Sequence, residues 1–291
     1  WLCSEFKGKI LLPSKKLLKE LNKPKKIFLW SEQGVGDQIM YGSLLNEFSK
    51  TCKLLTVRID KRLICLFEKK NPKIKFISQN DKVNEIDFDN HLSIADLGKF
   101  IRYEKKQFNN VVFPYIDTDE KFSNKIRDNL SNKHKLLIGI SWTSKAEMGQ
   151  EKSIYYKNLI PIFKLKNTSF IDLEYNNSEE DKKNIYQMTG KKIHRINEID
   201  YYNNILGVSS IINACDLIIT CSNVNAHISG ALGKKTFLLL PLGKGRLLNW
   251  SSENNTSLWY PSIKIYQQNE PEDWTTPIER VREEILNCQT Y

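Results

Sequence analysis

The residues of this chain that are able to do chemistry gather in short polar loops that follow apolar runs. The first such loop, residues 31–37, has the sequence SEQGVGD. A carboxylate placed in a ligand-binding loop can remove a proton from an acceptor hydroxyl, which makes Asp37 a candidate general base. The alternative is that Asp37 only caps the helix that follows, since Asp is common at helix starts. Glycine lets the backbone turn tightly and approach a ligand closely. The other candidates in this loop are Glu32, Gln33, Gly34 and Gly36.

A second loop, residues 220–227, has the sequence TCSNVNAH and leads into a predicted helix. Ser222 and Asn223 are both good N-cap residues. The backbone N–H groups at such a helix start, with Val224 as its first turn, are suited to bind a diphosphate. His227 lies one turn into the helix, where it either donates to a phosphate or ribose oxygen or is a buried histidine bonded to a carbonyl.

Two basic residues are further candidates for phosphate binding. Lys145 lies in the loop formed by residues 142–153, and Arg246 ends the sequence LGKGR. The alternative for each is a solvated surface charge, which is the commoner role of a single Lys or Arg in so basic a chain.

Apolar runs alternate with helical patterns twice along the chain, which predicts parallel strands joined by crossover helices. The predicted strands are residues 27–30, 54–58, 74–77, 86–88, 136–141, 169–173, 217–220 and 236–240. The predicted helices are residues 37–49, 60–68, 93–100, 120–130, 155–163, 178–188, 203–215, 223–232 and 277–287, the last with Thr276 as its N-cap. The expected fold class is therefore α/β: two Rossmann-like, doubly wound parallel-sheet domains, residues 1–132 and 133–291, facing each other across a cleft. Open parallel sheets bind ligands at the carboxyl ends of their strands.

The composition is that of a folded, basic chain. Its 291 residues are 40% hydrophobic, which excludes wholesale disorder. Lys and Arg outnumber Asp and Glu by 44 to 34, giving a net charge of +10. Because the lysines are spread along the chain, no dedicated nucleic-acid surface is expected. The densest group, residues 15–26, either attracts an acidic acceptor or keeps a linker soluble.

Cysteine use and hydropathy predict a cytoplasmic location. The six cysteines show no CxxC spacing, and Cys215 and Cys221 bracket a predicted strand too long for a bridge between its ends. The longest apolar stretch, residues 237–242, is far shorter than the roughly 20 residues that span a bilayer. The lysine-rich start does not fit a signal peptide, and a chain that begins with Trp1 is expected to be a fragment.

Three segments together resemble a known family: SEQGVGDQIMY (31–41), DLIITCSNVNAHISGALGK (216–234) and WYPS (259–262). They are similar to the glycosyltransferases that follow tetratricopeptide repeats in bacterial proteins, relatives of the ADP-heptose:lipopolysaccharide heptosyltransferases of glycosyltransferase family 9. The resemblance covers nearly the whole chain, and its long second segment, in this order and spacing, is specific.

The resemblance implies a GT-B fold with an acceptor domain first and a nucleotide-sugar domain second. It also implies inverting transfer with no bound metal and no cofactor besides the substrate, a nucleoside-diphosphate sugar. Asp37 matches the family's proposed base and Lys152 its diphosphate-binding residue. Ser222, Asn223 and His227 fall on the helix start that binds phosphate and ribose, where the heptosyltransferases usually carry Asp-Thr instead of Ser-Asn. The heptose donor is therefore not carried over.

Three other kinds of site or function are compatible with parts of the sequence. The sequence GVG lacks the third glycine of a dinucleotide fingerprint, since position 39 is Ile. Two Asp-x-Asp triplets, at residues 87–89 and 117–119, have the spacing of a divalent-metal site, but Asp also favours turns. A non-catalytic nucleotide- or glycan-binding module is the alternative function.

The partners expected of the enzyme are a nucleotide-sugar donor and an acceptor that is a glycan, a lipid-linked saccharide or a protein. Peripheral contact with the inner face of the membrane and tetratricopeptide repeats upstream of Trp1 belong to the same expectation.

Overall fold

The computed structural model divides the chain into two compact units, Trp1–Asp117 and Thr118–Tyr291. It describes residues 25–31, 34–130, 136–145, 149–176, 178–243, 250 and 252–289. Three candidate site residues, Glu32, Gln33 and Arg246, lie outside these ranges, as does most of the lysine-rich start. Each unit is described by itself.

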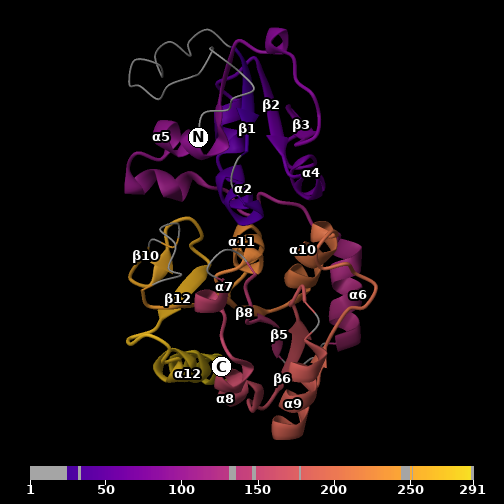
Figure 1. The fold of residues 1–291 in the computed structure, drawn as a ribbon, viewed down its shortest axis with the longest axis vertical. Helices are drawn as coiled ribbons and strands as arrows, with labels where there is room; N and C mark the ends of the chain where they lie inside the picture. The colour runs from indigo at the N-terminus through magenta and orange to yellow at the C-terminus, as the bar shows by residue number, and fades with distance from the viewer. Residues whose placement is uncertain are drawn as a thin grey trace. The chain divides into compact units, whose positions relative to one another are not determined.

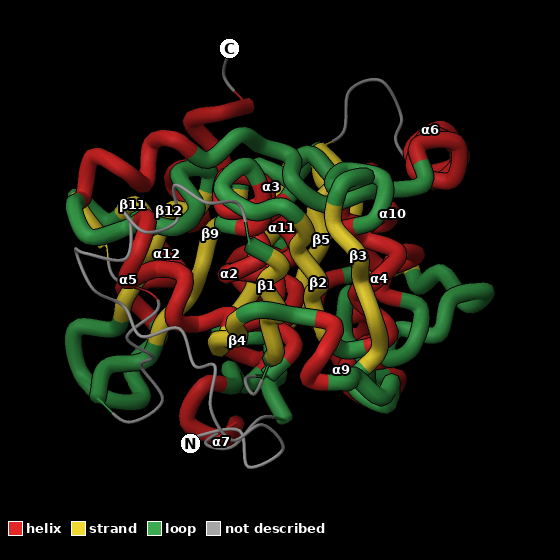
Figure 2. The backbone as a smooth tube through the Cα atoms, turned by 90° about the horizontal axis from the view of Figure 1, so that it is seen from above, coloured by secondary structure: helices red, strands yellow, loops and turns green. Residues whose placement is uncertain are grey.

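The first unit is a four-stranded parallel sheet with the strand order β3-β2-β1-β4 (Figure 2). The strands are β1 (Lys26–Trp30), β2 (Leu54–Ile59), β3 (Ile74–Ser78) and β4 (Asn90–Ser93). The helices are α2 (Val35–Gly42), α3 (Leu45–Ser49), α4 (Lys61–Phe67), α5 (Leu97–Ile101) and the short 3₁₀ turns η1 (Glu85–Asp87), η2 (Ile94–Asp96) and η3 (Lys105–Asn110).

The strand predicted over 86–88 is wrong. These residues belong to η1 and its end, and the fourth strand is formed by the next segment, β4. Phe88 is apolar because it is buried against Phe28, with ring centroids 5.3 Å apart. Asp89 then accepts the Lys26 N–H at 2.8 Å, which fixes the chain at the point where β4 begins to pair with β1.

The helix predicted over 37–49 is broken into α2 and α3. The hydroxyl and the N–H of Ser43 both donate to the Met40 carbonyl, which ends α2 in a tight turn. Gly42 lies just before this turn, where an added Cβ would come within 2.4 Å of the Phe67 ring. The glycine therefore lets α4 pack closely, although it weakens the helix.

The second unit is an eight-stranded sheet with the order β10-β11-β12-β9-β8-β5-β6-β7. The strands β7, β6, β5, β8, β9 and β12 run parallel, and β12, β11 and β10 pair antiparallel. The strands are β5 (Leu136–Ser141), β6 (Thr168–Asp172), β7 (Ile193–His194), β8 (Leu217–Cys221), β9 (Thr236–Leu240), β10 (Ser252–Glu253), β11 (Thr256–Ser257) and β12 (Ile263–Gln267).

Helices cover both faces of this sheet. On one face α8 packs with α9 and α12, around alternate strand residues such as Ile138 and Ile140. On the other, α10 packs with α6 and α11, and Figure 1 shows α6 beside α10. Every residue of β8 and β9 is buried, as expected of parallel strands covered on both sides. The helices are α6 (Glu120–Leu130), α7 (Gly149–Lys152), η4 (Tyr156–Leu159), α8 (Ile160–Phe163), α9 (Glu179–Thr189), α10 (Ile205–Ala214), α11 (Val224–Ala231) and α12 (Thr275–Gln289).

Most predicted elements of this half are confirmed within a few residues, but the predicted cap of the last helix is wrong. Helix α12 already includes Thr275, whose N–H donates to Asp273 Oδ1 at 2.8 Å, so Thr276 is not the N-cap.

Helix α6 precedes the boundary expected at residues 132/133 and packs on α10 of the second unit. Cys215 and Cys221 are both buried free thiols, as the strand between them predicts. No helix in the described ranges has the length and apolar character needed to cross a membrane.

Candidate functional site

The topology of the second unit predicts a ligand site at the carboxyl ends of its strands. From β5 the chain moves outward to β6 and β7, then returns to place β8 and β9 on the other side of β5. In open parallel sheets, ligands bind at the carboxyl ends of the strands where this direction reverses. The loops at that point are residues 142–153, after β5, and residues 222–223, after β8.

Asn223 ties these two loops together. Its Nδ2 donates to Ser141 Oγ and to the Thr143 carbonyl, both at 3.1 Å. Its Oδ1 accepts from Thr220 Oγ1 and from the Asn225 N–H, both at 3.0 Å, so the predicted N-cap of α11 is confirmed. With its amide committed in this way, Asn223 positions the site. It also occupies the N–H groups of Asn225 and Ala226, so a ligand at Val224 would rely on nearby side chains more than the sequence suggested.

Ser222 has a structural contact that the sequence did not predict. It is buried, and its Oγ accepts the indole N–H of Trp250 at 2.7 Å. The hydroxyl therefore anchors Trp250, whose ring centroid lies 4.7 Å from that of His227 at an interplanar angle of 32°.

His227 is buried between two aromatic residues and is neutral. Its Nδ1 lies 3.0 Å from the hydroxyl of Tyr260, which is also fully buried. Burial, and then the positive charge of Lys152, lower the pKa of His227 to about 3. An imidazole that cannot become charged near neutral pH offers a single N–H. If Tyr260 donates to Nδ1, that N–H is on Nε2, for which the described residues supply no hydrogen-bond partner.

Lys152 is a buried cation in this site, with 4% of its surface exposed. Its loop is closed by Ser153 Oγ, which accepts the Ser144 N–H at 2.9 Å and donates to the Gly149 carbonyl at 2.7 Å. Gly149 is required there, because an added Cβ would lie 2.2 Å from the Ser144 carbonyl oxygen. The charge of Lys152 acts on both His227 and the Cys221 thiol. The structure thus brings together Lys152, Asn223 and His227.

Lys145 lies in the same loop but in a different setting. Its side chain is exposed, with Nζ 5.9 Å from the ring centroid of Tyr175, just after β6. This is a partly solvated charge at the edge of the strand-end site.

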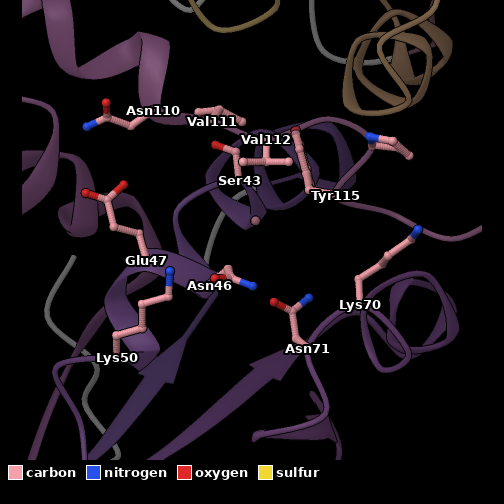
Figure 3. Close-up of a pocket in the computed structure, with 12 residues that line it drawn as sticks. Ser43, Asn46, Glu47, Lys50, Lys70, Asn71, Asn110, Val111, Val112 and Tyr115 are labelled. Atoms are coloured by element: carbon pink, nitrogen blue, oxygen red, sulfur yellow. The ribbon is translucent and has the colours of Figure 1, made fainter.

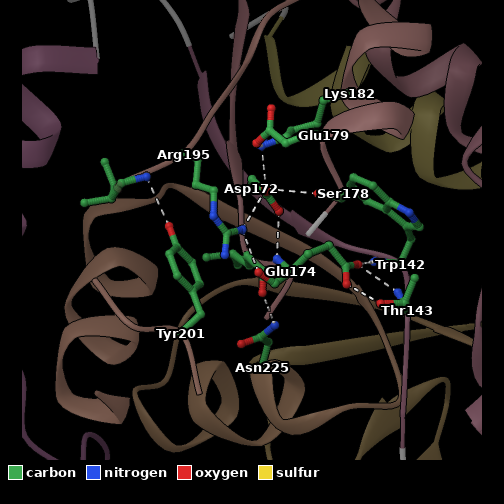
Figure 4. Close-up of polar contacts among 12 residues, drawn as sticks. Trp142, Thr143, Asp172, Glu174, Ser178, Glu179, Lys182, Arg195, Tyr201 and Asn225 are labelled. Carbon is green, nitrogen blue, oxygen red and sulfur yellow. Dashed lines mark hydrogen bonds and ion pairs between the residues drawn. The ribbon is translucent and has the colours of Figure 1, made fainter. Parts of the chain in front are cut away.

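The sequence did not indicate Glu174, which lies two residues after β6 and is fully buried (Figure 4). Its Oε1 accepts the N–H groups of Trp142 and Thr143, and its Oε2 accepts the Thr143 hydroxyl. Burial raises the pKa of Glu174 to about 7, against the lowering effect of these hydrogen bonds. A carboxylate directly after a parallel strand was the available signal.

In the first unit the same topological rule points to Asp37. The strand order reverses between β1 and β4, and Asp37 is in the first turn of α2, which follows β1. The N-cap of α2 is Gly34, and Asp37 is the third residue of the helix. Asp37 is half-buried. Burial, and then the negative charges of Asp37 and Asp96, raise the pKa of Tyr41.

The backbone conformation of this loop does not require glycine at position 34. Gly34 has φ −60° and ψ 166°, a conformation open to any residue. An added Cβ there would meet only Asp37 Oδ2, at 3.8 Å. Gly36 lies inside the first turn of α2. Close approach of a ligand is thus the remaining reason for glycine at position 34.

A cavity of about 420 Å³ lies on the side of this sheet where β2 and β3 begin (Figure 3). Helix α2 runs away from Asp37 and reaches the cavity at Gly42. Polar residues line it together with apolar ones, among them Ser43, Asn46, Asn71, Val112 and Tyr115. Its position separates it from the strand-end site, so we do not assign it to the same chemistry.

The Asp-x-Asp triplets have structural roles. Asp89 accepts the Lys26 N–H, as described above, and Asp119 accepts the Phe122 N–H at 3.0 Å at the start of α6. Asp117 pairs with Lys69 at 2.9 Å. Among the described residues, no group of three or more His, Cys, Asp or Glu is placed to hold a metal ion.

Packing of α11 on Tyr260 gives the first testable prediction. Replacing Gly230 with Ala is expected to lower the free energy of unfolding by about 1–3 kcal/mol, because the new Cβ would lie 2.4 Å from Tyr260 Cγ. Urea unfolding followed by circular dichroism measures the change. Gly98, in α5, is the control, since an added Cβ meets no atom within 4 Å. Gly98→Ala should leave stability unchanged or raise it slightly, and equal losses in both variants would contradict the packing described.

Comparison with known proteins places this geometry in a known architecture. The chain is similar to heptosyltransferase II of E. coli, which acts on ADP-heptose and lipopolysaccharide, with a TM-score of 0.60, 15% identity, and coverage of 91% of this chain and 98% of that one. It is also similar to a family 9 glycosyltransferase of Veillonella parvula, with a TM-score of 0.57, 14% identity, and coverage of 90% and 95%. The chain has a GT-B fold.

In sequence, the GT-B chain is 24% identical to the protein FlbA of Caulobacter vibrioides over 278 residues. The match covers 88% of this chain but 46% of FlbA, so the chain spans about half the length of that relative. No protein-family model matches it. Because these identities are low, they establish the fold alone.

Proposed function

We propose that this chain is a glycosyltransferase that moves a sugar from a nucleoside-diphosphate donor to an acceptor hydroxyl, with inversion and without a metal ion. One observation carries the proposal. At the reversal point of a GT-B unit, a buried ammonium, Lys152, lies near a neutral imidazole, His227, and the start of α11. Groups of this kind can stabilise a diphosphate without a metal ion. The family 9 resemblance and the similar solved structures support the glycosyltransferase part of the proposal.

The proposed reaction is one displacement. The acceptor oxygen forms a bond to the anomeric carbon as the bond between that carbon and the diphosphate oxygen breaks. The diphosphate gains negative charge, which the Lys152 ammonium offsets while a His227 N–H donates to it. Asp37 takes the proton of the acceptor hydroxyl. A single displacement of this kind inverts the anomeric centre.

A non-catalytic binding module is the second candidate, and one observation favours it. Ser222 and Asn223 stand where the heptosyltransferases usually carry Asp-Thr, and both side chains are committed to contacts inside the protein. A module of this kind would bind a nucleotide or a glycan without turnover. The acceptor class, peripheral membrane contact, a cytoplasmic location and upstream tetratricopeptide repeats also stay predictions.

Ligand binding followed by turnover tests the proposal. UDP, ADP and GDP, each with its sugar conjugates, are screened by thermal shift, and we expect at least one nucleotide to raise the melting temperature. The matching nucleotide sugar should then release its nucleoside diphosphate, and release should continue in EDTA. Binding without turnover would favour the module. Activity that disappears in EDTA and returns with manganese would contradict the metal-independent mechanism.

A further inference from the structure

The contacts of Glu174 converge on the first two residues of the loop that carries Lys152. Both carboxylate oxygens are used: Oε1 by the N–H groups of Trp142 and Thr143, Oε2 by the Thr143 hydroxyl (Figure 4). The side chain is fully buried. Glu174 therefore acts on the loop after β5, one strand away from its own.

The backbone of Glu174 is itself held in place. Its N–H donates to Asp172 Oδ1 at 2.8 Å, and its carbonyl accepts from Arg195 Nη1 at 2.7 Å. The same Arg195 atom lies 2.9 Å from Asp172 Oδ2, and Lys182 Nζ lies 3.2 Å from that oxygen. Arg195 also stacks on Tyr201, 4.0 Å from its ring centroid. The side chain thus extends from a rigid anchor toward Thr143.

Thr143 is held from its other side by the start of α11. Its carbonyl accepts Asn223 Nδ2 at 3.1 Å, and Asn223 is the N-cap of that helix. A continuous set of hydrogen bonds therefore runs from Glu174 through Thr143 to Asn223. The loop that continues from Thr143 is closed at its base by the Ile154 N–H, which donates to the Trp142 carbonyl at 2.8 Å, and Lys152 lies inside it.

We propose that Glu174 is a positioning residue for the donor: it sets the loop that presents Lys152 alongside α11, and its charge opposes a diphosphate bound there. This inference rests on the proposed function, because it concerns the ligand that the same site takes. Glu174 is fully buried and both of its oxygens are hydrogen-bonded to residues 142 and 143, so it acts through Thr143 and through its charge.

The charge of Glu174 changes near neutral pH. Its pKa of about 7 is raised first by burial and also by Asp172 on its own strand. Other charged or titratable groups on this corner are Tyr175 beside it, Cys221 at the end of β8, and the Lys182 and Arg195 partners of Asp172. The Cys221 thiol is affected by both Glu174 and Lys152, so the two charges act on the same end of β8. Below pH 7 Glu174 is neutral, and above it the anion repels a diphosphate.

Calorimetric titration of the chain with UDP, ADP and GDP from pH 6 to pH 8.5 tests this inference. For the nucleotide that binds, the wild-type Kd is expected to rise by about tenfold across pH 7. Glu174→Gln keeps an acceptor for the two N–H groups and donates to Thr143 Oγ1, so it should bind well with a much smaller pH dependence. Glu174→Ala leaves the loop donors unpaired and should weaken binding by about tenfold at every pH.

Glu179→Gln is the matched control, because it removes an exposed carboxylate of the same corner, one that pairs with Lys182 at the helix surface. It should titrate like wild type, and it also accounts for protonation of the nucleotide itself. Circular dichroism verifies that each variant is folded. Between about pH 4.5 and pH 7 wild type should lose stability relative to Glu174→Gln as pH rises, since the native state holds the Glu174 proton more tightly than the unfolded chain and the variant lacks this proton.

The outcomes separate the two proposals. If wild type binds a nucleotide and Glu174→Gln keeps the same pH dependence, or folded Glu174→Ala binds equally well, the role of Glu174 is wrong and the proposed function stands. If wild type binds none of the three nucleotides at any pH, both fail.

Discussion

Replacing Asp37 with Asn is expected to lower kcat for transfer by about 10³-fold while leaving the Kd for the nucleotide almost unchanged. Asn has the size of Asp but cannot take the proton of the acceptor hydroxyl. The diphosphate site that we propose belongs to the second unit, and its residues, Lys152 and His227, remain intact. Transfer to the acceptor and nucleotide binding are measured separately, so that a loss of chemistry is not confused with a loss of donor.

Asp96 supplies the control for this experiment. It follows β4 at the same reversal point, and its charge, like that of Asp37, raises the pKa of Tyr41. Its carboxylate pairs with the exposed Lys99 at 2.6 Å. Asp96→Asn should therefore keep most of the activity, whereas both variants should lower the pKa of Tyr41. Loss of activity in both to the same extent would show that the field around Tyr41 matters, and not a base at position 37.

The sequence was sufficient to locate the strand-end loops. Apolar runs such as those of β5, β8 and β9 are readily assigned as buried strands, and the carboxyl ends of neighbouring parallel strands lie on the same side of the sheet. Asn223 and His227 were predicted to lie at a strand end for that reason, Lys152 was assigned by the family resemblance, and the structure places the charge of Lys152 beside His227. Asp37 was also predicted at a strand end, and its position after β1 is confirmed.

The roles of side chains within the site could not be predicted in the same way. Ser222 was expected to contact a ligand, and the sequence did not show that its Oγ accepts the indole N–H of Trp250, 28 positions along the chain. Tyr260 belongs to a segment that the resemblance quotes, yet its contact with His227 depends on the packing of β12 beside β9 and α11. Glu174 follows a strand, which was a signal for the site, but an acidic residue in that position fits a turn equally well. Each of these roles arises from contacts between segments far apart in the sequence.

Replacing Lys152 with Met is expected to weaken nucleotide binding and to lower kcat, with a combined loss in kcat/KM of about 10²- to 10³-fold. Met fills nearly the same buried volume without the charge, so the fold should persist. The ammonium offsets charge that the diphosphate gains as the sugar leaves, and no other buried lysine or arginine of the described residues acts on both His227 and Cys221. Transfer kinetics and calorimetric titration of the nucleoside diphosphate give the two parts of the loss.

A second measurement on Lys152→Met does not depend on activity. Lys152 is one of the two causes that hold the pKa of His227 at about 3, so removing its charge should raise that pKa, although burial keeps it below the ordinary value of 6.5. Titration of the four histidines by NMR detects the change. Lys157→Met is the control, since Lys157 lies on the exposed ring of Tyr155 at 5.5 Å and should affect neither transfer nor His227. If the His227 pKa rises in Lys152→Met and transfer is unchanged, the geometry is right but the diphosphate is bound elsewhere. If neither changes, Lys152 does not lie beside His227, and the observation that carries the proposed function is lost.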